Sequence, residues 1–270
     1  MTGHGSVTPV DRFPDPEALG NALASEILAG IDEARRRGAS YVLGCPGGRS
    51  ARSTYRALAR QTHGADLRHV VIAMMDEYLV EEADGTLGLP PPNAHFSCRR
   101  FAHEEICGPL TASAVGGMGI ALDHVWLPDP ANPEAYEGRL EDAGGVDLFI
   151  LASGASDGHV AFVPPGTALD GTSAIIPIAD TTRRDNLATF PEFRSLDEVP
   201  RFGVSVGLGT IVRRSHSVRL VLTGEAKRRS AARVLAADDF DPAWPATVIH
   251  RCRDPRILLD AEADPRDEPT

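Results

Sequence analysis

The 270-residue sequence has 27 basic side chains, but only one of them, Lys227, is a lysine. It also lacks any long uninterrupted apolar run, whereas a membrane-spanning helix needs about 20 predominantly apolar residues. Residues 1–20 are acidic and contain prolines, and they lack the apolar core of a secretory signal. These absences predict a cytoplasmic protein with no membrane partner.

Cysteine is also scarce. Cys45, Cys98, Cys107 and Cys252 match neither a CxxC pair nor a zinc-binding spacing. In a cytoplasmic chain such cysteines are expected to be reduced and mostly buried. The nine histidines are spread along the chain, so we expect no metal site, and we expect no cofactor.

Acidic residues outnumber basic ones. The 38 acidic and 27 basic side chains give a formal net charge of −11 and a pI near 5.3. Because the arginines are scattered rather than gathered in one segment, nucleic acid is not expected as a partner. An anionic small molecule can still bind in a locally basic pocket, and the sequence is compatible with a homo-oligomer.

Apolar segments alternate with segments of helical periodicity. Helices are predicted at residues 16–37, 93–105, 133–141 and 226–236, with two shorter ones after residues 50 and 209. Apolar strands are predicted at residues 40–45, 69–75, 124–127, 147–153, 202–209 and 218–224. Such strands, separated by helices, indicate a mainly parallel sheet buried on both faces. The sequence therefore predicts an α/β fold, a single Rossmann-like three-layer domain over residues 15–260, with flexible termini at 1–14 and 261–270.

Polar residues directly after these strands are candidates for a site, because ligands of open parallel sheets bind outside the carboxyl ends of the strands. One such segment contains Gly47, Gly48, Arg49 and Ser50. Glycines let a backbone approach an anion, and the following helix offers free N–H groups. The same residues also fit a purely structural turn.

Two further segments carry acid-base groups. Asp76 and Glu77 follow the strand at 69–75 and fit either a carboxylate base or a solvated loop or helix cap. Asp157 and His159 lie two residues apart on a glycine-flanked turn, where the carboxylate can fix the imidazole tautomer and raise its basicity. A purely structural histidine is the alternative.

The fourth segment contains Lys227, in the first turn of the predicted helix that follows residues 218–224. A cation at the positive end of a helix dipole is unfavourable and indicates an anion that offsets it. Together the four segments predict an anion site, a carboxylate base and an Asp-His pair at one edge of the sheet.

The strings VVIAMMDEYL, SDGHVAF, VSVGLGTI and LVLTGEAK resemble, in order and spacing, the glucosamine-6-phosphate deaminase and isomerase family, which shares its fold with 6-phosphogluconolactonases. The resemblance spans about residues 15–260, and Tyr78 and Phe162 are closer to the deaminase branch. It implies the sugar-phosphate isomerase/deaminase type of fold. It also implies aldose-ketose isomerisation, with or without ammonia release, of a 2-amino-2-deoxy sugar 6-phosphate or a close analogue.

The resemblance also implies roles for the acid-base groups. Asp76 would move the proton between C2 and C1 of the opened sugar. His159 would move the proton that opens the ring, with Asp157 orienting it, and Glu77 would be structural. The phosphate would be held by Lys227 and the backbone of Gly47, Gly48 and Ser50.

Three positions depart from the family pattern. Pro164 stands where the family has a glutamate that assists ring opening, and Ala188 where it has an arginine that reaches the phosphate. Arg49 replaces the usual Ser or Thr of the phosphate loop. We hypothesise that Arg49, with Arg52 as a second candidate, supplies the charge lost at Ala188.

Two other functions fit the same residues. A lactonase would use His159 to activate water against a cyclic ester, without moving a C2 proton. A non-catalytic sugar-phosphate sensor is the other alternative, although no room for a helix-turn-helix segment is expected before Pro16 or after Asp260.

Overall fold

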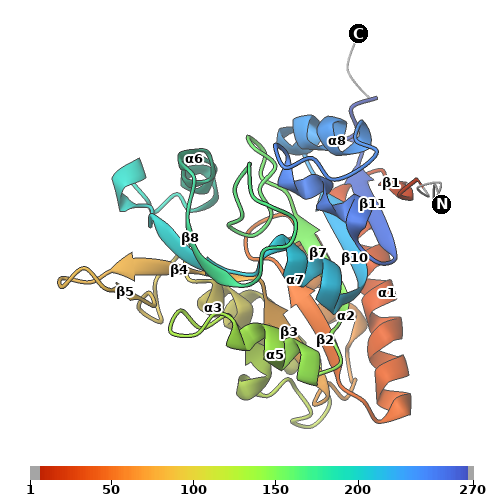
Figure 1. Ribbon diagram of the computed structural model, residues 1–270. Coiled ribbons are helices and arrows are strands. Elements are labelled where there is room, and N and C mark those ends of the chain that lie inside the picture. The colour runs from red at the N-terminus through yellow and green to blue at the C-terminus, as the bar shows by residue number, and fades with distance from the viewer. Residues whose placement is uncertain (1–6, 267–270) are drawn as a thin grey trace.

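The main sheet has seven strands, and every pairing between them is parallel (Figure 1). It lies within residues 7–266, the part of the chain that the computed structural model describes. From one edge to the other, the strands are β1 (Val10–Phe13), β11 (Pro255–Asp260), β10 (Ser215–Leu222), β7 (Val146–Ala152), β2 (Tyr41–Cys45), β3 (Val70–Met74) and β6 (Val125–Trp126). The chain runs outward from β2 to β6 on one side and from β7 to β11 on the other. The switch point, where ligands bind in such sheets, therefore lies between β2 and β7.

Both faces of the sheet are apolar, because alternate residues of each strand point to opposite sides. In β7, Leu148 and Ile150 pack in one hydrophobic cluster, and Phe149 and Leu151 pack in the other. This is the physical reason that the strands are apolar throughout in the sequence.

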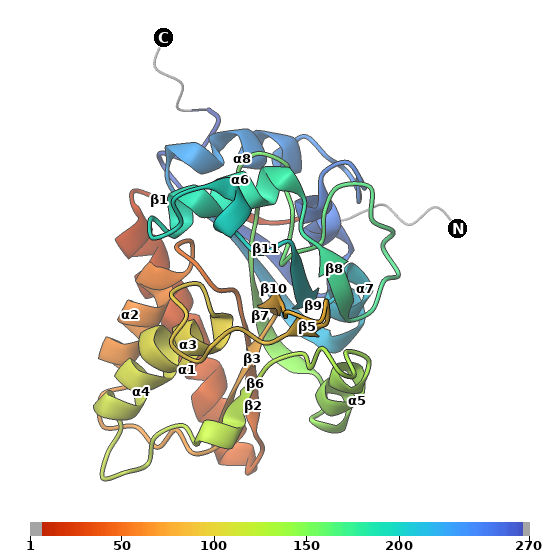
Figure 2. The ribbon, with the colours of Figure 1, turned by 90° about the vertical axis from the view of Figure 1, so that its left-hand side faces the viewer.

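Helices cover both faces and give the three layers (Figure 2). One face carries α1 (Pro16–Arg37), α2 (Arg52–Gln61), and a continuous helical run of α3 (Cys98–Phe101), the π-helix η1 (Ala102–Cys107) and α4 (Gly108–Ser113). The other carries α5 (Ala135–Asp142), α7 (Leu208–Arg214), α8 (Arg228–Leu235) and the 3₁₀ helix η5 (Pro245–Arg251). Further single 3₁₀ turns are η2 (Leu122–His124), η3 (Leu196–Glu198) and η4 (Glu225–Lys227). The predicted α/β three-layer fold is confirmed, and within residues 7–266 no helix is both long and apolar enough to cross a membrane.

A second, antiparallel sheet was not predicted. Its strand order is β5 (Leu87–Gly88), β4 (Asp76–Glu81), β9 (Phe202–Ser205) and β8 (Ala174–Pro177). The segment after residue 75, where no strand is predicted, is therefore strand β4, and the strand predicted at 202–209 pairs with β4 instead of joining the parallel sheet. This small sheet and α6 (Asp180–Thr189) lie to one side of the main sheet (Figure 1).

The described parts of the two ends for which flexibility is predicted contain ordered elements. Val10–Phe13 form the edge strand β1, and Ala263 and Asp264 are buried. An edge strand needs no continuous apolar run, and here Arg12 donates to Asp264 at 2.8 Å. The remaining residues of those predicted ends, 1–6 and 267–270, lie outside the described residues.

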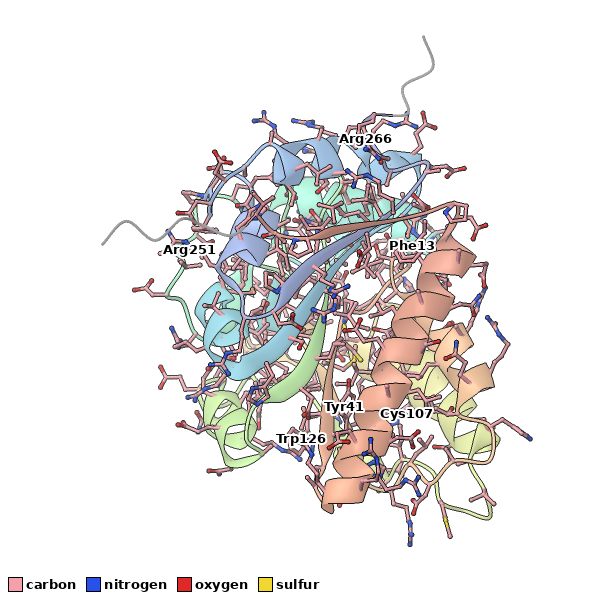
Figure 3. All side chains as sticks on the ribbon, turned by 90° about the vertical axis from the view of Figure 1, so that its right-hand side faces the viewer. Phe13, Tyr41, Cys107, Trp126, Arg251 and Arg266 are labelled. Carbon is pink, nitrogen blue, oxygen red and sulfur yellow. The ribbon has the colours of Figure 1, made fainter. Side chains whose placement is uncertain are left out.

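The helix predicted from residue 93 to 105 begins later and runs further. It starts at Cys98, because the Ser97 hydroxyl caps the helix by accepting a hydrogen bond from the N–H of Arg100. The helical run then continues through Ser113. The cysteines are free, and three of the four are buried, as expected. Side chains fill the space between α1 and the sheet (Figure 3).

Candidate active site

A cleft of about 370 Å³ opens at the carboxyl ends of β2, β3, β7 and β10. It includes the switch point between β2 and β7. Seven of the eight predicted site residues line it: Gly47, Gly48, Arg49, Ser50, Asp76, His159 and Lys227. The eighth, Asp157, lies directly behind His159. The structure thus brings four segments that are distant in sequence to one place.

Asp76 lies where the chain leaves the main sheet. Met74 ends β3, and Asp76 begins β4 in the small sheet, so the carboxylate stands at the junction of the two sheets. The residue is 6% exposed, and burial raises the pKa of Asp76 from 3.8 to about 7, against the opposing effect of a hydrogen bond from the Cys98 thiol. A carboxylate with a pKa near 7 is suited to general-base chemistry at neutral pH.

Glu77 points away from this chemistry. Its two carboxylate oxygens accept hydrogen bonds from the N–H groups of Tyr78, Cys98 and Arg99 and from the Ser97 hydroxyl, at 2.8 to 2.9 Å. A negative group at the first turn of a helix also interacts favourably with the helix dipole. Glu77 therefore caps α3, which agrees with the structural role that the resemblance implies.

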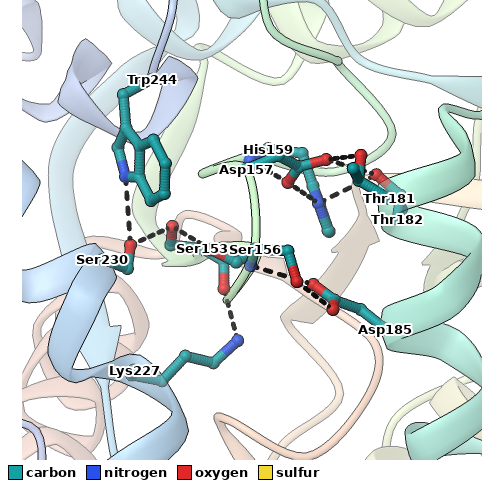
Figure 4. Close-up of polar contacts among 11 residues, drawn as sticks. Ser153, Ser156, Asp157, His159, Thr181, Thr182, Asp185, Lys227, Ser230 and Trp244 are labelled. Atoms are coloured by element: carbon teal, nitrogen blue, oxygen red, sulfur yellow. Dashed lines mark hydrogen bonds and ion pairs between the residues drawn. The ribbon is translucent and has the colours of Figure 1, made fainter.

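The Asp157–His159 pair is present as expected. Nδ1 of His159 lies 2.7 Å from Asp157 Oδ1 and 3.0 Å from the Thr182 hydroxyl (Figure 4). Thr181 and Thr182 also donate to the other oxygen of Asp157. Burial alone would raise the pKa of Asp157, but the hydrogen bonds and charge of His159, together with Thr181, hold it below its usual range. A charged Asp157 fixes the proton on Nδ1 and leaves Nε2 of His159 for a ligand.

Glycine at position 154 is needed for this arrangement. A Cβ there would lie 2.1 Å from Nδ1 of His159 and 2.6 Å from Asp157 Oδ1. The main chain of Gly154 also donates to the His159 carbonyl at 2.8 Å. The turn after β7 therefore packs closely against Asp157 and His159 and fixes the orientation of the two side chains.

Lys227 lies in η4, directly before α8. Its ammonium donates to the Ser153 carbonyl at 2.5 Å (Figure 4), and burial lowers the pKa of Lys227. The preceding turn is fixed by buried Asp260 of β11, which accepts the N–H of Gly224 at 3.0 and 3.1 Å. The contact with Asp260 was not foreseen from the sequence.

Arg49 is exposed and borders the cleft, so its guanidinium is available to an anionic ligand there. Arg52 does not line the cleft. Its guanidinium lies 3.5 Å from Glu105 and over the ring of Phe101, so the idea that Arg52 joins Arg49 is wrong.

The two other departures from the family pattern, Pro164 and Ala188, do not line the cleft. Arg183, near Ala188 on α6, is buried and donates to the carbonyls of Leu196 and Val199. It therefore holds the η3 segment and does not face the cleft.

Asp185 of α6 was not among the predicted site residues. It lines the cleft and accepts hydrogen bonds from the hydroxyl of Ser156 at 2.6 Å and from its N–H at 3.2 Å (Figure 4). Within residues 7–266, Asp157, His159 and Asp185 each place one ligand atom within 4.8 Å of the others. The Asp185 carboxylate is hydrogen-bonded by Ser156, and the Asp157 carboxylate by Thr181, Thr182 and His159.

The cleft thus has two chemically different regions. A buried carboxylate and an imidazole oriented by a second carboxylate can exchange protons with a bound molecule. Lys227, Arg49 and the glycine loop can hold an anionic group. This division suits a small molecule that carries a phosphate at one end and reacts at the other.

Comparisons with known proteins agree with this geometry. The model of the family described as glucosamine-6-phosphate isomerases/6-phosphogluconolactonase matches residues 14–258. The glucosamine-6-phosphate deaminase of Mycolicibacterium smegmatis is 33% identical over 256 residues, which cover 94% of this chain and 90% of that protein. The enzyme of the same name from Shouchella clausii is 26% identical over 249 residues, which cover 89% of this chain and 92% of that protein.

Solved structures show the same fold. A monomeric glucosamine-6-phosphate deaminase matches with a TM-score of 0.78 at 24% identity, over 96% of this chain and 100% of that one. A 6-phosphogluconolactonase from Trypanosoma brucei matches with a TM-score of 0.68 at 19% identity, over 96% of this chain and 98% of that one.

Proposed function

Because this chain belongs to the glucosamine-6-phosphate isomerase and 6-phosphogluconolactonase family, we propose that it catalyses the aldose-ketose isomerisation or deamination of a 2-amino-2-deoxy sugar 6-phosphate such as glucosamine 6-phosphate. The substrate is a small-molecule sugar phosphate. The proposal includes a cytoplasmic location and no role for nucleic acid or a membrane.

The observation that carries the proposal is the position of Asp76 in the same cleft as the Asp157–His159 pair. Isomerisation needs two separate proton transfers. His159 moves the proton between the C1 hydroxyl and the ring oxygen as the pyranose opens, and Asp157 keeps its imidazole in the required tautomer. Asp76 then takes the proton from C2 and returns it to C1.

The phosphate end anchors the substrate for these steps. Lys227, Arg49 and the backbone from Gly47 to Ser50 line the same cleft and offer positive charge and N–H groups. Fixing the far end of the sugar makes proton transfer at C2 effectively intramolecular, which accelerates it strongly.

A lactonase would use the residues of this site differently. Hydrolysis of a lactone would use His159 and water, but it would give Asp76 no proton to move. A buried carboxylate whose pKa is raised to about 7 favours the isomerase or deaminase reaction, because that reaction uses such a base.

The test is to incubate the protein with glucosamine 6-phosphate in deuterated water and, separately, with 6-phosphogluconolactone. We expect ammonia release or deuterium incorporation from the first substrate, and loss of both in Asp76→Asn. Asp142→Asn makes the same chemical change at an exposed position and serves as the control. Lactone hydrolysis that is insensitive to Asp76→Asn would contradict the proposal, as would ligand binding without any turnover.

A further inference from the structure

The Cys98 thiol contacts the carboxylate to which we assign the C2 proton transfer. Its Sγ lies 3.3 Å from Asp76 Oδ1. In residues 7–266 this is the one hydrogen bond recorded to the Asp76 side chain. Cys98 is 6% exposed and lines the cleft, and its Sγ lies 3.6 Å from the place that a Cβ on Gly47 would occupy. It therefore stands between the base and the phosphate loop.

We propose that Cys98 is a positioning residue of this site, whose thiol holds the Asp76 carboxylate in the charged form that accepts a proton. The inference rests on the proposed function in one respect, the assignment of Asp76 as the base. It adds a residue to which neither the sequence pattern nor the family resemblance gave a role in the reaction.

The adjacent glutamate determines where the thiol lies. The N–H of Cys98 donates to Glu77 Oε1 at 2.8 Å, and the N–H of Arg99 donates to Oε2 at 2.8 Å. Glu77 therefore fixes the first residue of α3 against the strand that carries Asp76. The two consecutive carboxylates therefore both accept hydrogen bonds from Cys98. Glu77 accepts one from the main-chain N–H of this cysteine, and Asp76 accepts one from its thiol.

The thiol remains a donor throughout the working pH range. Burial raises the pKa of Cys98, and the charges of Asp76 and Glu77 raise it further. A protonated thiol that donates to a carboxylate favours the charged form of that carboxylate. In Asp76 this effect opposes burial, which raises the pKa of the carboxyl.

Other titratable groups around Asp76 do not replace the thiol. The groups that interact with it electrostatically, besides Cys98, are Glu77 and Tyr78 on β4, Tyr55 on α2 and Tyr136 on α5. Burial raises the pKa of all three tyrosines, so they are uncharged. The Tyr55 and Tyr136 hydroxyls donate to the carbonyls of Pro46 and Met74. The charged or titratable groups elsewhere in the cleft lining are His159, Asp185, Glu225, Arg49 and Lys227.

The experiment compares the pH dependence of kcat/KM in wild type, Cys98→Ala, Cys98→Val and Cys98→Ser. Loss of the donor raises the pKa of Asp76. The acidic limb of the pH profile, where kcat/KM rises as Asp76 loses its proton, therefore moves to higher pH. We expect an upward shift of roughly 0.5 to 1 pH unit in the Ala and Val variants, and about 3- to 10-fold lower kcat/KM at pH 6. Cys98→Ser keeps a donor and is expected to restore the wild-type limb.

Two features of the design separate this effect from a loss of packing. Cys98→Val fills the space of the thiol without donating. Cys107→Ala removes a thiol with the same 6% exposure in the same hydrophobic cluster, away from the cleft, and is expected to leave the limb unchanged. An equal shift in the Ser and Val variants would overturn the proposal, as would a limb that none of the three substitutions moves.

A direct titration of the Asp76 carboxyl carbon by NMR in the free, labelled protein tests the same contact without a substrate. The same upward shift is expected in Cys98→Val, and its absence would overturn the proposal. If wild type shows no C2 exchange but the carboxyl pKa still moves, the proposed function has failed and the hydrogen-bond inference has not.

Discussion

The ammonium of Lys227 donates a hydrogen bond to the main-chain carbonyl of Ser153 at 2.5 Å. Lys227 follows β10 and Ser153 follows β7, and these strands are neighbours in the parallel sheet. The ends of the two strands therefore fix the only lysine of the sequence at the edge of the cleft. The ammonium keeps further hydrogen atoms to donate to an anionic ligand.

Lys227→Arg is expected to lower kcat/KM for a sugar phosphate by about 10-fold or more, because a planar guanidinium cannot reproduce the geometry of a compact ammonium at a half-buried position. Steady-state kinetics measure the effect. Arg56→Lys, the reverse exchange at an exposed position, is the control and is expected to be silent. Wild-type activity in Lys227→Arg would count against the assignment of this residue to the phosphate.

Arg49→Ala is expected to raise KM by about 10-fold or more, because a charge-assisted hydrogen bond to the phosphate is lost. Arg52→Ala is the matched control three residues later, and it should leave KM unchanged because its guanidinium pairs with Glu105 outside the cleft. An unchanged KM in Arg49→Ala would show that this arginine does not compensate for Ala188.

Asp76→Asn is expected to make the protein more stable at pH 8 while abolishing exchange at C2. The pKa of Asp76 is raised from 3.8 to about 7, so the folded protein retains a proton that the unfolded chain releases. The contribution of Asp76 to the free energy of unfolding is fully present below about pH 4 and is lost as the pH rises to about 7. The neutral side chain avoids this loss, and we expect a gain in the free energy of unfolding of about 1 to 3 kcal/mol at pH 8.

Urea unfolding at pH 5 and pH 8 checks this expectation. The gain should be much smaller at pH 5, where the folded Asp76 carboxyl is mostly protonated. Asp142→Asn, at an exposed position, provides the baseline for a surface exchange. A gain of the same size at both pH values would exclude burial of the Asp76 charge as its cause.

Arg219→Met is expected to destabilise the fold by about 2 kcal/mol, because Arg219 is a buried cation that joins Glu26 of α1 to Asp254 before β11. Its side chain is 3% exposed. Arg256 is its direct neighbour in the sheet, but its pair with Asp11 is exposed, so Arg256→Met should cost less than about 1 kcal/mol. Denaturant midpoints of the two variants measure the difference. Equal losses of stability would contradict the expectation that the buried ion pairs contribute more than the exposed one.

Much of the fold could be predicted because the central strands of a doubly covered parallel sheet are apolar at most positions. The strands β2, β3, β7 and β10 all followed from that pattern, as did helix α1. The edge strand β1 did not, since Val10 and Phe13 are separated by two charged residues that pair with partners near the C-terminus. Strand β9 was found but assigned to the wrong sheet, because a short apolar run does not specify its partner.

The sequence by itself determined which acid-base and cationic side chains follow the ends of the central strands. The carboxyl ends of parallel strands lie at the same edge of a sheet, so the sequence alone places Asp76, His159 and Lys227 in one cleft. Only the tertiary structure decided that Cys98 touches Asp76, that Asp185 enters the cleft and that Asp260 holds the turn before Lys227. These contacts join segments far apart in the chain, and local hydrophobic periodicity carries no information about which distant side chains will meet.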